Sequence, residues 1–201
     1  MKIYFTRHGE TEWNRKDIIQ GWKDSPLTEE GIAMARELAV KAKNIPFDHV
    51  YSSDLKRAYH TAKIICPHRR IIRTRLLREI DVGYWSGKHF KDVQHRDPAL
   101  HRRYFENPKR YNRLDGESFY DLIKRVETFF QKAVYSSEDQ NILVVSHGIT
   151  MIAMFFIMEK LPMEQFWDNR VRRNAEFNVA EYKDGQFTIL KKAPLNPITT
   201  I

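Results

Sequence analysis

The sequence predicts an α/β fold, a three-layer α/β/α sandwich around a mostly parallel central sheet with a small cap insertion. Short runs of β-branched, aliphatic and aromatic residues alternate along the chain with longer segments of helical periodicity, which is typical of parallel sheets covered by helices. The length of 201 residues suits one domain spanning 1–201. With 42% hydrophobic and 12% aromatic residues, the composition supports a sizeable core and excludes global disorder.

The first elements are a strand, a loop and a helix. Lys2–Thr6 is predicted as a buried strand that delivers the loop starting at Arg7. Polar and turn-rich residues predict a long loop over Glu10–Pro26. A helix then runs to about Lys43 with Thr28 as its N-cap, because two acids follow in the first turn, where the helix dipole favours them.

The next elements complete a βαβαβ pattern. They are a strand over Phe47–Ser52, a helix from Asp54 to about Ile65, and a short strand over Arg70–Arg73. From Tyr84 to Gly116 the periodicity is lost, and two prolines interrupt a dense mixture of basic residues, histidines and aromatics. We interpret residues of about 84–116 as an insertion or cap.

Regular elements return in the C-terminal part of the chain. A helix, an apolar strand, a buried helix and a β-hairpin follow one another, and Gly185 supplies the positive φ that the hairpin turn needs. The predicted ranges are Glu117 to about Tyr135, Asn141–Ser146, Ile149 to about Leu161, Ala175–Tyr182 and Gln186–Leu190.

Several features predict a cytoplasmic protein without membrane association. The single cysteine, Cys66, excludes an intrachain disulfide and suits a reducing compartment. The longest apolar stretch, Ile149–Met158, is far shorter than the roughly 20 residues that span a bilayer. The first residues lead directly into Arg7 and His8, without the apolar segment and cleavage site of a secretory signal.

The charge balance favours an anionic partner. There are 34 basic and 26 acidic residues, a formal net charge of +8, which suits nucleic acid, anionic membranes or phosphorylated small molecules. Acids are interspersed throughout, and neither long runs of like charge nor zinc-finger spacing occurs. This pattern disfavours nucleic acid, so we expect a phosphorylated small-molecule substrate.

Three predicted strands end in groups suited to phosphate chemistry. In a parallel sheet these ends meet at one edge, where ligands bind. Arginine binds phosphate oxygens through a planar fork of donors, and a helix that starts after Gly148 would direct its positive end to an anion. The groups are Thr6-Arg7-His8-Gly9, Ser52-Ser53-Asp54 followed by Arg57, and Ser146-His147-Gly148.

Together with neighbouring segments, these groups resemble the histidine phosphatase superfamily over nearly the whole chain. The superfamily includes cofactor-dependent phosphoglycerate mutases and many small phosphatases. The matching motifs are Arg7-His8-Gly9-Glu10-Thr11 with Trp13-Asn14, Asp24-Ser25-Pro26-Leu27-Thr28 with Gly31, Ser52-Ser53-Asp54-Leu55 with Arg57-Ala58 and Thr61-Ala62, Leu77-Arg78-Glu79, and Ser146-His147-Gly148.

The resemblance implies a phosphatase that hydrolyses phosphomonoesters of small metabolites through a phosphohistidine intermediate. His8 would be the nucleophile, and Glu79 would protonate the leaving alkoxide and later accept a proton from water. Cations around the phosphoryl oxygens are the main electrostatic requirement. The residues expected to bind the substrate are Arg7, Asn14, Gln20, Arg57, His147 and Gly148.

Two other functions stay open, a cofactor-dependent phosphoglycerate mutase and a non-catalytic phosphate-binding or scaffold protein. Mutases of this superfamily typically carry a longer insertion between the acid and the second histidine, whereas Glu79 and His147 are 68 positions apart. Their tail also shields the intermediate from water, whereas Pro194–Ile201 is short and lacks basic residues. Hydrolysis is therefore favoured, and the filled catalytic positions disfavour a scaffold.

Other phosphate chemistries fit the sequence poorly. Gly83–His89 resembles a P-loop, but it is one residue short and lacks Ser or Thr after the lysine. Cys66 has Ile72 where a cysteine phosphatase needs arginine, and it suits a core position at a helix end. Three histidines between 89 and 101 recur every six residues and do not share a helix face, so we assign no metal and no cofactor.

The substrate itself cannot be predicted. Many small phosphatases of the family carry Trp-Glu-Gly where this chain has Trp85-Ser86-Gly87, so a second acid is absent there. Gly116-Glu117-Ser118 matches the family but fits an ordinary helix start equally well. Tyr84–Asp115 holds eight Lys and Arg against four acids, and both a second anion-binding site and a solvated surface stay open. Nothing in the sequence indicates the oligomeric state.

Overall fold

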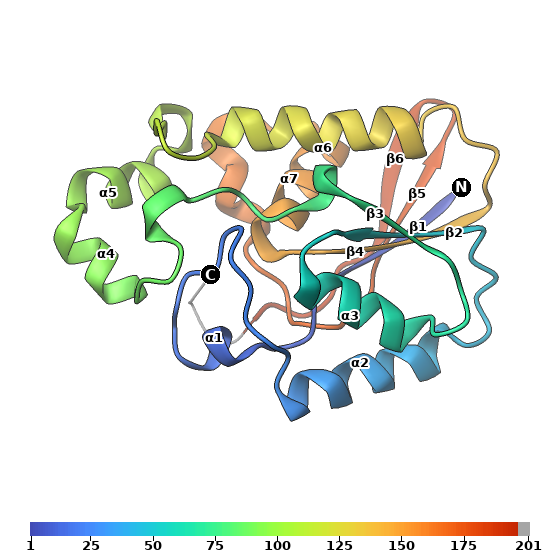
Figure 1. Cartoon of the computed structure of the whole chain (residues 1–201). Coiled ribbons are helices and arrows are strands. Elements are labelled where there is room, and N and C mark those ends of the chain that lie inside the picture. The colour runs from blue at the N-terminus through green and yellow to red at the C-terminus, as the bar shows by residue number, and fades with distance from the viewer. Residues whose placement is uncertain (197–201) are drawn as a thin grey trace.

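A computed structural model describes residues 1–196, and within them a six-stranded sheet lies between two layers of helices (Figure 1). The strand order is β3-β2-β4-β1-β5-β6. The strands from β1 to β4 are mutually parallel, β5 is antiparallel to β1, and β6 is antiparallel to β5. The predicted α/β architecture with a mostly parallel sheet is confirmed.

The strands lie within a few residues of the predicted ranges. The β5–β6 hairpin has its predicted turn, with Asp184 at φ 51° and Gly185 at φ 77°. The strands are β1 (Lys2–Arg7), β2 (His49–Ser53), β3 (Ile71–Thr74), β4 (Asn141–Ser146), β5 (Asn178–Lys183) and β6 (Gln186–Lys191).

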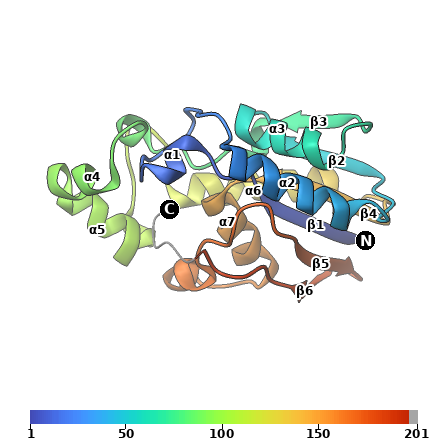
Figure 2. The same cartoon turned by 90° about the horizontal axis from the view of Figure 1, so that it is seen from below.

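Two pairs of helices cover the two faces of the sheet. Figure 2 shows α2 and α3 on one face, and α6 and α7 lie on the opposite face in Figure 1. The α-helices are α1 (Glu12–Arg15), α2 (Glu29–Ala42), α3 (Lys56–Ile65), α4 (Phe90–Arg96), α5 (Pro98–Glu106), α6 (Phe119–Ala133) and α7 (Gly148–Met158). Short 3₁₀ turns span Arg75–Leu77, Gly83–Trp85, Pro108–Arg110 and Met163–Asn169.

The sheet faces carry separate apolar cores, because successive side chains of a strand point to opposite faces. Ile142 and Val144 of β4 belong to the core under α6 and α7, whereas Leu143 and Val145 belong to the core under α2 and α3. This explains why β4 is a continuous apolar run. Burying each such side chain contributes roughly 1.5–3 kcal/mol of transfer free energy, which holds the strand ends in place.

The helix predicted with Thr28 as its N-cap is confirmed, since the Thr28 side chain accepts a hydrogen bond from the Gly31 N–H group. The prediction of a loop throughout residues 10–26 is wrong in one part, because Glu12–Arg15 form the short helix α1. Thr11 and Asn14 form a reciprocal capping box there. Asn14 takes the position usually held by Glu or Gln, so the sequence lacks the usual capping-box pattern at this helix start.

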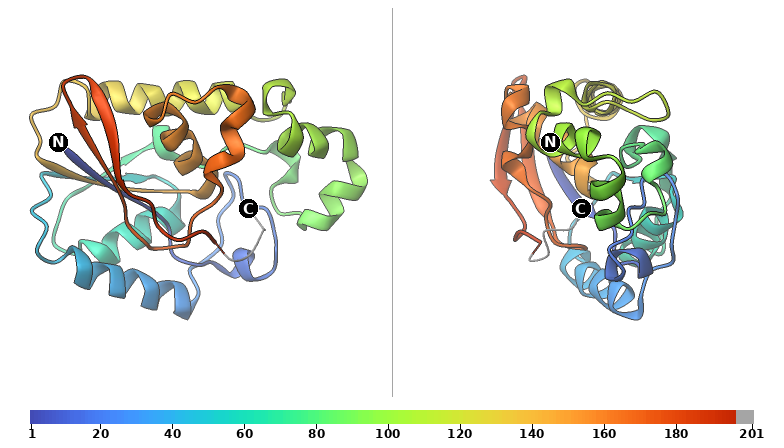
Figure 3. Two further views of the ribbon diagram at one scale, coloured as in Figure 1. Left: turned by 180° about the vertical axis from the view of Figure 1, so that it is seen from behind. Right: turned by 90° about the vertical axis from the view of Figure 1, so that its left-hand side faces the viewer.

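Residues 84–116 extend from the edge of the sheet at which the strands β1 and β4 end. Figure 3 shows α4 and α5 at that end of the molecule. Residues 197–201, the last five of the C-terminal segment Pro194–Ile201, lie outside the described residues. Among residues 1–196, no helix is long and apolar enough to cross a membrane.

Candidate active site

The register of β1 against β4 brings the two His-Gly pairs together. Arg7 is the partner of Ser146 in the parallel ladder, and the His8 N–H group donates to the Ser146 carbonyl at 3.0 Å. The rings of His8 and His147, the next residues along each strand, have centroids 5.2 Å apart. Both histidines therefore lie at the carboxyl edge of the sheet.

The hydrogen bonds of His8 determine its tautomer. Nδ1 lies 2.7 Å from the Gly9 carbonyl oxygen, and because a carbonyl only accepts, Nδ1 carries the proton. Nε2 is therefore unprotonated, and its lone pair accepts a hydrogen bond from Nε–H of Arg57 at 3.3 Å. Burial, with the charges of Arg57 and Arg7, lowers the pKa of His8 well below its ordinary value. At neutral pH the ring is neutral and suited to nucleophilic attack.

Arg57, in the first turn of α3, is anchored from several sides. Its Nη1 donates to the Lys23 carbonyl at 2.7 Å and to Asp24 Oδ1 at 2.8 Å, and Nη2 donates to the Gly21 carbonyl at 2.8 Å. Asp24 also accepts from the N–H groups of Lys56 and Arg57, at 2.9 and 3.3 Å. It thereby caps α3, whose own N-cap residue makes no side-chain bond. The guanidinium is held in one orientation beside His8.

Arg7 and His147 have buried nitrogen atoms without partners in the described part of the chain. These atoms are Nε and Nη1 of Arg7 and both ring nitrogens of His147. Burial lowers the pKa of Arg7 to about 10, so the guanidinium keeps its charge at neutral pH. Burial and the Arg57 charge lower the pKa of His147 well below its ordinary value. Since unpaired buried polar groups are costly, both residues are poised for a ligand with oxygen acceptors.

Glu79 lies against the start of α7. Its Oε1 accepts from Thr150 N–H at 3.1 Å and Ile80 N–H at 3.0 Å, and its Oε2 accepts from Ile149 N–H at 3.2 Å. The Thr150 hydroxyl lies 3.2 Å from Oε1 but donates its single proton to the nearer Arg78 carbonyl at 2.7 Å. The prediction that the start of α7 directs its positive end to a substrate anion is wrong for the Ile149 and Thr150 N–H groups. A carboxylate satisfies these helix-terminal donors instead. Of the two oxygens, Oε2 has the freer lone pairs.

The other predicted binding residues differ in which atoms are free. Asn14 Oδ1 accepts from the Thr11 N–H and hydroxyl groups, which leaves its amide nitrogen available as a donor. Gln20 uses its amide nitrogen on Thr11 Oγ1 at 2.9 Å. At Gly148 a Cβ would lie 3.2 Å from Cγ1 of Val171, which is a tight contact, and 3.7 Å from Cζ of Arg7, which is an ordinary van der Waals distance.

A side-chain pair behind the site was missed in the sequence. Arg125 Nε and Nη2 each donate to Glu117 at 2.8 Å, and its Nη groups also donate to the carbonyls of Arg78 and Glu79 at 2.9 and 3.2 Å. Glu117 in turn accepts from Asp81 N–H at 2.9 Å. The pair fixes the main chain on both sides of Glu79. The one sequence signal for this pair is Gly116-Glu117-Ser118, which matches the family but also fits an ordinary helix start.

His8, Arg57 and Glu79 line one pocket together with Arg7 and Asn14. No Lys or Arg of the 84–116 segment lines it. Of the two interpretations of that basic segment, this favours the solvated surface. The side chains of the remaining wall are mostly apolar, and they include Ile19, Ile80, Val82, Tyr104 and Ile149.

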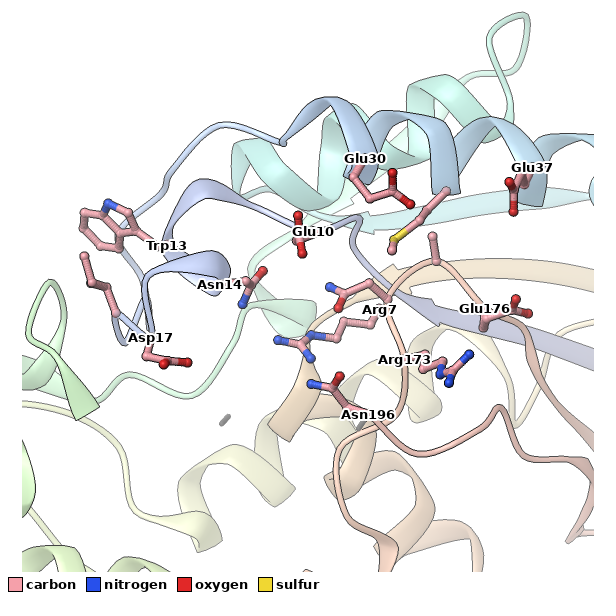
Figure 4. A pocket seen from close by; sticks show the side chains of 14 residues that line it. Arg7, Glu10, Trp13, Asn14, Asp17, Glu30, Glu37, Arg173, Glu176 and Asn196 are labelled. Carbon is pink, nitrogen blue, oxygen red and sulfur yellow. The ribbon is translucent and has the colours of Figure 1, made fainter. Parts of the chain in front are cut away.

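A larger cavity of about 350 Å³ opens beside Arg7 and Asn14 (Figure 4). Figure 4 shows the Arg7 guanidinium between the amides of Asn14 and Asn196. Acidic side chains, among them Glu30 and Glu37 of α2, also line this cavity. Neither His8 nor Glu79 does, so it adjoins the reacting groups without containing them.

Competing chemistries find little support in the described residues. Among residues 1–196, no three His, Cys, Asp or Glu side chains are grouped to hold a metal ion. Cys66 follows the end of α3 and is buried in the core, as predicted. Burial raises the pKa of its thiol to about 11, so it is protonated at neutral pH and a poor nucleophile.

Comparison with known proteins assigns the family. The family described as "Histidine phosphatase superfamily (branch 1)" matches residues 3–193. The chain belongs to this superfamily. The predicted family and the phosphatase activity that it implies are thereby confirmed.

The similar proteins carry names of several activities. Adenosylcobalamin/alpha-ribazole phosphatase of Salmonella typhimurium is 32% identical over 86% of this chain and 87% of its own. Phosphoserine phosphatase 1 of Hydrogenobacter thermophilus is 33% identical over 95% and 91%. Probable phosphoglycerate mutase GpmB of an Enterobacter species is 32% identical over 92% and 86%. The solved structure of Bacillus stearothermophilus YhfR superimposes with a TM-score of 0.91 at 30% identity, covering 97% of this chain and 98% of that one.

Proposed function

We propose that this phosphatase hydrolyses phosphomonoesters of small molecules by forming a phosphohistidine on Nε2 of His8. The observation that carries the proposal is the His8 tautomer. Nδ1–H is bound to the Gly9 carbonyl, so Nε2 is the unprotonated nitrogen, and the anchored cation of Arg57 orients its lone pair through a long hydrogen bond of 3.3 Å that attack on phosphorus would replace. Phosphoryl transfer needs mainly this alignment and positive charge around the equatorial oxygens.

In the first step, Nε2 of His8 attacks phosphorus while the ester P–O bond breaks. Arg7, with its unpartnered buried nitrogens, the Asn14 amide and His147 bind the phosphoryl oxygens. The leaving alkoxide takes a proton from the Glu79 carboxyl group, and Oε2 is the better placed oxygen because it accepts one N–H hydrogen bond against two at Oε1.

In the second step, water attacks the phosphohistidine and the P–N bond breaks. The Glu79 carboxylate takes the proton that the water loses, which restores the acid for the next cycle. His8 leaves as the neutral ring, since its pKa lies well below the ordinary value. One carboxyl group therefore serves both half-reactions and no cofactor is consumed.

A labelling experiment tests the intermediate. Rapid quenching with a radiolabelled phosphomonoester should give one acid-labile, base-stable phosphoryl group per chain, located on His8. His8→Ala should abolish both the label and turnover while the circular dichroism spectrum stays unchanged. A label on Cys66 or on a serine would contradict the mechanism.

The role of Glu79 can be tested through the leaving group. An alkoxide needs a proton as the bond breaks, whereas p-nitrophenolate leaves unaided, so Glu79→Gln should slow phosphorylation by alkyl phosphates far more than by aryl phosphates. The variant should also release one equivalent of p-nitrophenol in a burst before slow turnover. Equal losses on both substrates without a burst would remove Glu79 from this role.

A mutase activity is the second candidate, because one similar protein is named a probable phosphoglycerate mutase. Hydrolysis is favoured because Glu79 and His147 are only 68 positions apart in the chain. With phosphoglycerate as substrate, phosphate release should exceed isomerisation. Isomerisation that outpaces phosphate release would make the protein a mutase.

A further inference from the structure

Tyr104 of α5 is the residue that the 84–116 segment contributes to the pocket of His8 and Glu79. The cavity of Figure 4 contains neither of those two reacting groups. On the proposed function, the leaving oxygen must reach Glu79 while phosphorus faces His8. The leaving group therefore extends along the side of the site that Glu79 and Tyr104 line, where the pocket shares Arg7 and Asn14 with the larger cavity.

The Tyr104 ring is held rigidly by other aromatic rings. Its centroid lies 4.9 Å from that of Tyr111, 5.0 Å from Phe119 and 5.2 Å from Trp167, and the residue is only 3% exposed. The indole N–H of Trp167 also donates to the Tyr104 carbonyl at 2.7 Å. Such tilted and edge-on aromatic contacts restrict the ring to one position.

The hydroxyl group of Tyr104 is free, unlike those of its neighbours. It takes part in none of the hydrogen bonds within residues 1–196, whereas the Tyr111 hydroxyl accepts from Arg113 and the Tyr84 hydroxyl donates to Asp97. Burial, with Tyr111 and Glu79 nearby, raises the pKa of Tyr104 well above its ordinary value. The hydroxyl is therefore protonated, and it can both donate and accept.

The surroundings of this hydroxyl select the kind of group that it would bind. The wall of the pocket that Tyr104 lines includes the apolar side chains of Ile80, Val82 and Ile149. Its cations are Arg7 and Arg57, which belong to the phosphoryl side with His8, and no Lys or Arg of the 84–116 segment lines it, so a second anionic group on the leaving side would have no counter-charge of its own. A neutral hydroxyl substituent needs only the single hydrogen bond that Tyr104 offers.

We propose that Tyr104 determines specificity by hydrogen-bonding a hydroxyl substituent of the leaving group. The preferred substrates are then phosphomonoesters of small, uncharged polyols. This inference deepens the proposed function and rests on it.

Three substrates and two variants test the inference. Glycerol 3-phosphate carries hydroxyl groups, propyl phosphate lacks them, and 3-phosphoglycerate replaces one hydroxymethyl group with a carboxylate. Wild-type kcat/KM should be highest for glycerol 3-phosphate. Tyr104→Phe should lower kcat/KM for glycerol 3-phosphate about tenfold, the effect of one lost hydrogen bond, and change that for propyl phosphate by less than about twofold.

Tyr111→Phe is the matched control, because it removes a hydroxyl from the same aromatic cluster that is bonded to Arg113 and does not line the pocket. It should leave the ratio of kcat/KM between glycerol 3-phosphate and propyl phosphate unchanged, whatever its effect on Tm. An unchanged ratio in Tyr104→Phe, or equal losses on both substrates, would overturn the inference.

The wild-type enzyme alone gives a second test that does not depend on a variant. If it hydrolyses propyl phosphate as well as glycerol 3-phosphate, Tyr104 does not select a hydroxyl substituent. If it prefers 3-phosphoglycerate, which keeps one hydroxyl but adds a carboxylate, the inferred preference for uncharged leaving groups is wrong. These outcomes leave the proposed function intact. That function fails separately, through the absence of an acid-labile label on His8.

Discussion

Asp24 provides a sharp prediction, because one half-buried loop carboxylate holds both α3 and the buried cation beside the nucleophile. Its side chain is 22% exposed, whereas that of Arg57 is 1% exposed. Burial lowers the pKa of Arg57, and the charge of Asp24 opposes that shift. Replacing Asp24 with alanine therefore removes a helix cap and a charge-assisted bond in one step.

The magnitude follows from the separate contacts. Loss of the cap to the N–H groups of Lys56 and Arg57 costs about 1 kcal/mol, and loss of the bond to the buried guanidinium costs about 2 kcal/mol. Asp24→Ala should thus destabilise the protein by about 3 kcal/mol. For a chain of this length, each kcal/mol lowers Tm by roughly 2–4 °C.

Asp24→Asn keeps a neutral acceptor for the cap and should cost only about 1 kcal/mol of stability.

The activity should fall less steeply than the loss of a catalytic residue would cause. In Asp24→Ala, Arg57 retains its bonds to the Lys23 and Gly21 carbonyls, so kcat/KM should fall by about tenfold rather than vanish. Urea unfolding followed by circular dichroism measures the stability, and p-nitrophenyl phosphate hydrolysis measures the activity.

Glu176→Ala is the control, since it breaks the exposed pair with Lys41 and should cost less than about 1 kcal/mol. The reasoning about Asp24 is refuted if Asp24→Ala is as stable as this control. It is equally refuted if the asparagine variant is as unstable and inactive as the alanine variant.

The remaining predictions concern protonation, metals and packing. In the folded protein the pKa of His147 lies well below its unfolded value of about 6.5, so the unfolded chain binds more protons below that pH and the free energy of unfolding falls as pH falls. Between pH 7.5 and 5.5 the wild type should lose about 1.4 kcal/mol more stability than His147→Gln, as measured by urea unfolding. Equal losses in the two proteins would contradict this. Activity should survive exhaustive EDTA treatment, because the two arginines of the site supply the positive charge, and a loss restored only by Mg²⁺ or Zn²⁺ would contradict this. Gly31→Ala should destabilise by at least about 2 kcal/mol, since its Cβ would lie 2.1 Å from the Glu10 carbonyl oxygen; wild-type stability in urea would show that this close backbone contact can relax.

Much of the fold and the edge that carries the candidate site could be predicted, because both follow from local patterns. Alternating apolar runs and capping residues such as Thr28 act over a few neighbours. Once the strands are assigned, parallel pairing brings residues that follow different strands to one edge. The ladder between β1 and β4 does this for His8 and His147, with Arg7 opposite Ser146.

The supporting contacts could not be predicted in this way, because they join residues far apart in the chain. Asp24 meets Arg57 across 33 positions, and the Arg125 side chain meets the Glu79 carbonyl across 46. Neither partner has a local pattern that names the other. Tyr104 could not be predicted either, because α5 has only nine residues and the position of the Tyr104 ring depends on aromatic rings from other segments.

The two arginines of the site are held so differently that they are suited to different tasks. Arg57 has carbonyl and carboxylate partners for most of its N–H groups, so its position is fixed before a ligand arrives and its free energy of burial is already offset. Arg7 is almost as deeply buried, yet two of its nitrogens have no partner within the described residues. An incoming phosphoryl group gains little new hydrogen bonding from Arg57 and much from Arg7. We therefore expect Arg57 to orient His8 and Arg7 to supply most of the phosphate affinity, so that Arg7→Lys should raise KM more than Arg57→Lys does.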